Sequence, residues 1–88
     1  MLKVYPESDV SVIKRNDQQY TIEHLRSQSN DKVAVWRDDY LVGTADIDHE
    51  GNSIDIAFQK TEGDWHETQA VYDKFDDVIS VAEYIIDC

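Results

Sequence analysis

Hydrophobic and polar residues alternate along much of the chain, and a period of two residues is typical of a half-buried β-strand. The alternation is clearest over residues 53–59, where Ile54, Ile56 and Phe58 share one face. The residues between them are polar or small. This segment therefore predicts a strand with one buried face.

The first third of the chain predicts a β-hairpin. Val10 and Val12 alternate with polar neighbours, and Tyr20 and Ile22 do so again. The polar residues 16–18 separate the two runs and supply the turn.

Residues 33–37 and 40–47 are two further strand candidates, joined by a turn at residues 38–39. In the second candidate, a strict period of two gives one face to Leu41, Gly43, Ala45 and Ile47. It gives the other face to Tyr40, Val42, Thr44 and Asp46. Residues 68–75 are either one more strand or the first turn of a helix.

Near the end of the chain, the spacing of apolar residues changes from that of a strand to that of a helix. Val78, Ala82 and Ile85 recur at helical spacing. One of two adjacent aspartates just before them can cap the helix, since its side chain can accept a backbone N–H bond there. We therefore expect a helix over about residues 77–87.

These elements predict an α+β fold in a single domain, residues 1–88. The sheet is antiparallel, with five to six short strands, and the C-terminal helix packs on one face. We expect the helical stripe to lie against Ile54, Ile56 and Phe58. The opposite face of the sheet is expected to be solvated.

Charge is distributed unevenly along the chain. The net charge is −11. Residues 1–37 hold five acids against six bases, whereas residues 38–88 hold fourteen acids against Lys60 and Lys74. The first part is therefore at +1 and the second at −12. Direct nucleic-acid binding is disfavoured, because phosphate contacts need a patch of lysine and arginine.

Cys88 is the one cysteine, so no disulfide can form within the chain. We expect a cytoplasmic protein, since a reducing compartment is the default for such a chain. No apolar run approaches the 18 or so residues of a membrane span, and we predict no membrane partner.

The sharpest local pattern lies at residues 46–57 and matches part of a calcium-binding loop. Asp46, Asp48, Glu50 and Gly51 stand at its first, third, fifth and sixth positions. The twelfth position is Ala57, where a bidentate glutamate is required. We therefore predict an acidic hairpin and no metal site, with a weak divalent-metal module as the lesser alternative.

Other combinations of chemically active residues are weak, and we predict a protein that is not an enzyme and has no cofactor. No two of His24, His49, His66 and Cys88 have the close spacing of a structural zinc site. The adjacent carboxylates at 38–39 and 76–77 suit turns and caps better than acid–base catalysis. The three glycines are isolated and form no phosphate loop.

The acidic part of the chain is the best candidate for a binding surface. Asp46 and Asp48 lie two residues apart on one strand, and Asp55 lies on its expected neighbour, so their carboxylates can form a spaced array. Aromatic residues beside charge are typical of binding hot spots. The predicted partner-binding residues are Asp38, Asp39, Tyr40, Asp46, Asp48, Glu50, Asp55, Asp64 and Trp65.

In size, charge and expected fold, the chain resembles the small acidic inhibitors made by phages and mobile elements, which include anti-CRISPR proteins and DNA mimics. It resembles equally the immunity proteins that neutralise nuclease toxins. The resemblance rests on the acidic half and implies an inhibitor that occludes a basic, nucleic-acid-handling protein. The alternative is an acidic structural or housekeeping domain, which is then either monomeric or a homodimer.

Overall fold

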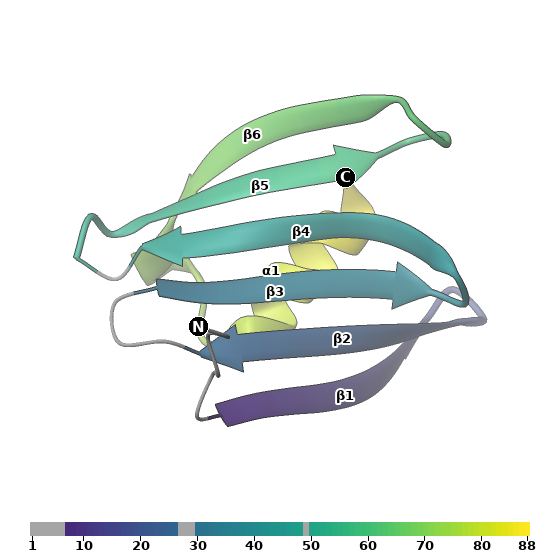
Figure 1. Ribbon diagram of the computed structural model, residues 1–88, viewed down its shortest axis with the longest axis horizontal. Coiled ribbons are helices and arrows are strands. Elements are labelled where there is room, and N and C mark those ends of the chain that lie inside the picture. The colour runs from purple at the N-terminus through teal and green to yellow at the C-terminus, as the bar shows by residue number, and fades with distance from the viewer. Residues whose placement is uncertain (1–6, 27–29, 49) are drawn as a thin grey trace, which may run out of the picture.

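A computed structural model describes residues 7–26, 30–48 and 50–88 of the chain. Its six strands follow one another in space as they do in sequence, and each pairs antiparallel with the next. The order ends in a short 3-10 helix and an α-helix (Figure 1). The elements are β1 (Glu7–Arg15), β2 (Gln18–Arg26), β3 (Asn30–Arg37), β4 (Tyr40–Asp48), β5 (Ser53–Gln59), β6 (Trp65–Val71), η1 (Tyr72–Lys74) and α1 (Val78–Asp87).

The predicted α+β fold, with one C-terminal helix on one face of an antiparallel sheet, is confirmed. Of the two alternatives for residues 68–75, the strand is right as far as Val71, and the 3-10 helix η1 follows it. His49 and the loop residues 27–29 lie outside the described residues.

Short turns join the first strands. Asn16 and Asp17 connect β1 to β2, and both have positive φ, 54° and 63°. Two positive φ values in a two-residue loop match the twist of the flanking strands, and asparagine and aspartate tolerate them better than most residues. Asp38, which follows β3, also has a positive φ. The polar residues that predicted these turns therefore meet a backbone requirement.

The core lies on the sheet face that α1 covers, which we call the inner face. Tyr20 and Ile22 of β2 are buried there. Their partners across the strand pair are Ile13 and Ser11. Val10 and Val12 consequently point to the opposite, outer face and are exposed. The hairpin prediction holds, but its two alternating runs lie on different faces.

A β-bulge changes the faces of β4. Val35 pairs with Gly43 and Trp36 pairs with Leu41, so the pairing skips Val42. One extra residue reverses the faces of the strand residues on one side of the bulge relative to those on the other. Leu41 therefore shares the outer face with Trp36, and the prediction that it lies beside Gly43 and Ile47 is wrong.

The helix lies where it was expected in the chain, but the predicted set of buried residues was slightly out of phase. Val81, Ala82 and Ile85 are buried, whereas Val78 is half-buried. The predicted stripe omitted Val81, although it completes the i, i+3, i+4, i+7 pattern that starts at Val78. The helix lies chiefly over β3 and β4 and less over β2, and its buried residues share one core cluster with Ile54 and Ile56 of β5.

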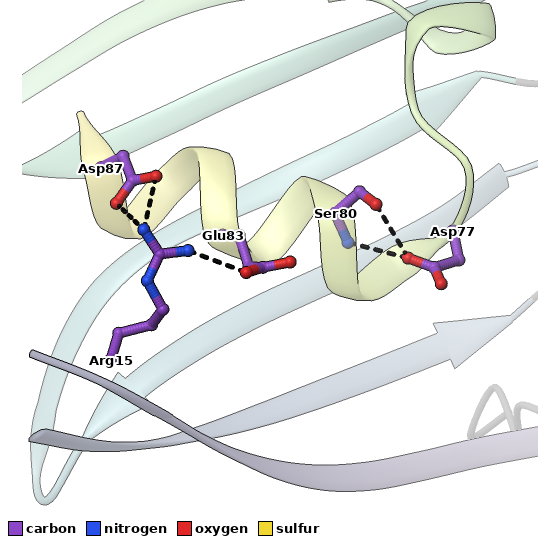
Figure 2. A network of polar contacts seen from close by, with 5 residues as sticks. All are labelled: Arg15, Asp77, Ser80, Glu83 and Asp87. Atoms are coloured by element: carbon purple, nitrogen blue, oxygen red, sulfur yellow. Dashed lines mark hydrogen bonds and ion pairs between the residues drawn. The ribbon is translucent and has the colours of Figure 1, made fainter.

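Polar contacts hold both ends of α1 (Figure 2). Arg15, at the end of β1, donates one hydrogen bond of 2.8 Å to Glu83 and two, of 2.7 and 2.9 Å, to Asp87. These bonds raise the pKa of Arg15 above its ordinary value, and the bond to Glu83 has the largest effect. At the other end, Asp77 accepts bonds from the backbone N–H and the hydroxyl of Ser80, at 2.8 and 3.0 Å.

Removal of the Asp77 cap is expected to lower the stability of the protein measurably. Asp77→Ala removes the acceptor for the Ser80 N–H and is expected to cost about 1 kcal/mol of unfolding free energy. That corresponds to a fall in Tm of roughly 4–8 °C for a domain of this size, measured by circular dichroism. Asp76→Ala removes the exposed neighbouring carboxylate and should stay within about 0.5 kcal/mol. Equal losses in the two variants would contradict the capping role.

Candidate functional site

The outer face of the sheet is the candidate site. The helix lies on the inner face, and in Figure 1 the sheet passes in front of it, so the outer face is turned toward the viewer. No described element covers this face. It is therefore the largest regular surface that the described residues leave open to a partner.

Three exposed carboxylates form what we call the acidic strip: Asp46 on β4, Asp55 on β5 and Glu67 on β6. Asp46 and Asp55 are direct cross-strand partners. Glu67 pairs with Ala57, which is two residues from Asp55 along β5. The strip lines an open depression of about 490 Å³ together with Thr44, Ala57 and Gln69.

The charges of the strip are only weakly compensated within the chain. The Nζ of Lys32 lies 3.9 Å from Asp46, and both side chains are exposed, so this ion pair contributes little. Gln69 donates a hydrogen bond of 2.8 Å to Asp55. Like charges directly opposite each other destabilise a sheet. The facing carboxylates of Asp46 and Asp55 therefore favour a positively charged ligand between them.

Asp48 and Glu50 lie beyond the strip, at the turn from β4 to β5. The Asp48 carboxylate accepts the backbone N–H bonds of Glu50 and Gly51, both at 3.1 Å. It thus closes its own turn, which accounts for the partial resemblance of this loop to a calcium site. Across the described residues, no group of three or more His, Cys, Asp or Glu side chains is placed to hold a metal ion.

The other predicted residues lie at the opposite end of the sheet. Asp38 and Asp39 form the β3–β4 turn, and Asp64 and Trp65 lie at the start of β6. Asp38, Asp39, Asp46, Asp48, Asp55 and Asp64 are all exposed, as a partner-binding surface requires. Asp46 and Asp55 share the outer face as cross-strand partners, whereas Asp38, Asp39 and Asp64 gather at the other end of the sheet.

The two aromatic residues predicted to bind a partner, Trp65 and Tyr40, lie on different faces of the sheet. Trp65 is 45% exposed and belongs to the outer face by its register. Tyr40 lies on the helix side, because the bulge turns it toward Arg37, whose guanidinium sits 5.2 Å from the ring centre. Its hydroxyl donates to the carbonyl of Gln59 at 3.3 Å. Of the two, only Trp65 is available beside the outer face.

The structure also reveals a buried pair that the sequence interpretation missed. His24 and Asp31 face each other on the inner side of β2 and β3, with Nε2 and Oδ2 3.0 Å apart. They are 7% and 9% exposed. Both line a cavity of about 340 Å³ beneath the start of α1, with Tyr72 and Phe75. The signal was available, because His24 continues the alternation of Tyr20 and Ile22 and Asp31 precedes that of Val33 and Val35.

Cys88 is a poor candidate for a nucleophile. Burial raises the pKa of its thiol above the ordinary value, and the neighbouring charge of Asp87 raises it further. A raised pKa leaves less thiolate at neutral pH, and the thiolate is the reactive form.

The chain matches no protein-family model, no curated protein and no solved structure. Within the parts of the chain that the structure describes, no helix combines the length and apolar character needed to cross a membrane.

Proposed function

We propose that this chain is a non-enzymatic inhibitor that binds a basic, nucleic-acid-handling protein through the acidic strip and so occludes that protein's nucleic-acid site. The observation that carries the proposal is the cross-strand pair Asp46 and Asp55, extended by Glu67, on a face that no described element covers. These carboxylates stand where a basic partner would otherwise meet phosphates.

The spacing of the strip supports this role. Neighbouring strands lie about 4.7–4.9 Å apart, and alternate residues on a strand lie about 6.6–6.8 Å apart. The strip therefore sets three carboxylates across two strand spacings, a local density of negative charge that attracts the lysine and arginine side chains used for phosphate contacts. Trp65 is an exposed aromatic residue on the same face. It supplies the apolar contact that charged interfaces usually need.

The same surface connects the chain to the inhibitors it resembles. Phage and mobile-element inhibitors of the anti-CRISPR and DNA-mimic kind, and nuclease immunity proteins, are the classes we propose for it. We place it in the cytoplasm, because its one cysteine, Cys88, implies no disulfide within the chain.

Charge reversal tests the proposal. The tagged chain is used to capture proteins from extracts of its native host, with and without phage infection, and captured proteins are then measured in pure form. Asp46→Lys/Glu67→Lys should slow association at least about tenfold at low salt, because electrostatic steering raises association rates by 10- to 1,000-fold. Added duplex DNA or RNA should compete with the chain for the partner.

A control of equal charge sharpens the test. Glu62→Lys/Asp76→Lys makes the same change at exposed positions away from the strip, and it should leave most of the association rate intact. The melting temperature of both variants should stay near that of the wild type, since exposed substitutions usually change stability by less than about 0.5 kcal/mol. If both variants bind as the wild type does, or if nucleic acid fails to compete, the inhibitor proposal is wrong.

A second candidate function is an acidic structural or housekeeping domain, whose charge serves solubility. Acids away from the strip favour it, including Asp38 and Asp39 at one end of the sheet and Asp76 near the helix. This candidate predicts that the two charge-reversal variants behave alike, so the same experiment separates the two functions.

A further inference from the structure

Strand β1 (Glu7–Arg15) is an edge of the sheet. It is nine residues long and pairs with β2 in an unbroken register. The described residues place no strand against its other side. Val10 and Val12 stand on it and, at 66% and 56% exposure, are the two most exposed large hydrophobic side chains of the described residues. A long, regular edge strand that exposes apolar side chains is a template for pairing with another strand.

We propose that two copies of this chain pair through β1, antiparallel and related by a two-fold axis, so that their sheets join into one continuous sheet. A two-fold axis perpendicular to the sheet places one residue of β1 opposite itself. With Ser11 on the axis, Val10 of each copy lies opposite Val12 of the other. This register buries both exposed valines in two cross-strand pairs, and β-branched pairs of this kind stabilise sheets.

Charge favours a second copy at this edge. In sequence, β1 begins with acids at positions 7 and 9 and ends with Lys14 and Arg15. Antiparallel alignment sets the start of each strand opposite the end of the other that carries Lys14 and Arg15, so that ends of opposite sequence charge meet. The opposite edge, β6, is flanked by Glu62, Asp64 and Asp73 and would bring acids together.

The position of the acidic strip is compatible with this pairing. The strip lies on β4, β5 and β6, and both β2 and β3 separate it from β1. Strands lie about 4.7–4.9 Å apart, so the strips of the two copies are separated by well over the Debye length of about 8 Å at physiological salt. The inference does not rest on the proposed inhibitor function, since it concerns a different edge and a different set of residues.

Sedimentation equilibrium of the purified chain tests the pairing. The apparent mass should rise from 10.2 kDa toward twice that value as the concentration increases. Val12→Lys should weaken the dimer at least tenfold, because it places two charges in the paired edge. Val10→Lys should do the same. Circular dichroism on each variant establishes that the fold is retained.

Val71→Lys is the matched control. It makes the same substitution at a similarly exposed valine, 43%, on the opposite edge strand β6. It should dimerise as the wild type does. A wild-type chain that stays monomeric at every concentration overturns the proposal. So does a Val12→Lys variant that dimerises normally, or a dimer that only Val71→Lys disrupts.

Cross-linking fixes the register. Single cysteines are placed at position 10, 11 or 12 in a Cys88→Ser background, which removes the exposed native thiol. Each cysteine meets its own copy in only one two-fold register, and directly opposite residues lie within disulfide reach. Ser11→Cys should form the dimer under mild oxidation. Cross-linking through Val10→Cys or Val12→Cys instead overturns the proposed register, and cross-linking through none of them overturns the β1 interface.

Discussion

Gly43→Ala is expected to destabilise the protein by about 3 kcal/mol, because overpacking at a closed site typically costs 1–3 kcal/mol and sometimes more. A Cβ atom at position 43 would lie 2.6 Å from Cγ2 of Ile85 and 2.7 Å from the carbonyl oxygen of Ala57. The oxygen belongs to the backbone of the neighbouring strand, and Ile85 is a buried anchor of the helix. Neither atom can move without shifting an element of the fold.

The measurement is thermal unfolding by circular dichroism, where the loss corresponds to a fall in Tm of roughly 12–24 °C. Two other glycines are controls. Gly63 has a φ of 82° and no atom near its Cβ position, so alanine there adds backbone strain of about 1–2 kcal/mol. In Gly51→Ala the close contact, at 2.6 Å, is with the flexible Asp48 carboxylate, and the change should cost about 0.5–1.5 kcal/mol through the turn hydrogen bonds of Asp48. If Gly43→Ala proves the mildest of the three, the close packing of the helix on β4 is wrong.

Gly43 also shows which parts of the fold the sequence predicts. The alternation of apolar residues in β5 and the helical spacing from Val78 to Ile85 were sufficient for the fold class, because both periods are local properties of the chain. The bulge at Val42 was not predictable in the same way. It depends on how β4 pairs with β3, and nothing in the local pattern marks the extra residue.

The candidate site was predictable to a similar extent. The exposure of Asp46 and Asp55 follows from the outward register of their strands, which alternation reveals. Glu67 was absent from the predicted site. The strand expected over residues 68–75 begins earlier, at Trp65, so Glu67 lies on β6. Asp48 was predicted to face a partner, but its carboxylate binds its own turn. A choice between solvent and backbone partners depends on turn geometry, which composition does not reveal.

The buried pair His24 and Asp31 gives the second large effect. Asp31→Ala is expected to cost about 2–4 kcal/mol of unfolding free energy, because it leaves the imidazole buried without this partner. The loss has the same direction for either protonation state of His24. A neutral ring loses a hydrogen bond in a desolvated site, and a charged ring loses its counterion.

The chain supplies a matched control for that variant. His66 and Asp64 form a pair with nearly the same separation, 3.1 Å, but both side chains are substantially exposed to solvent. Asp64→Ala should therefore cost no more than about 1 kcal/mol, since water replaces the lost partner. Chemical denaturation of both variants gives the comparison, and a double-mutant cycle with His24→Ala isolates the coupling within the buried pair. Similar losses for Asp31→Ala and Asp64→Ala would show that burial does not set the strength of the His24 contact. A much larger loss for Asp31→Ala, with strong coupling to His24, would show that the pair anchors β2 to β3 beneath the start of α1.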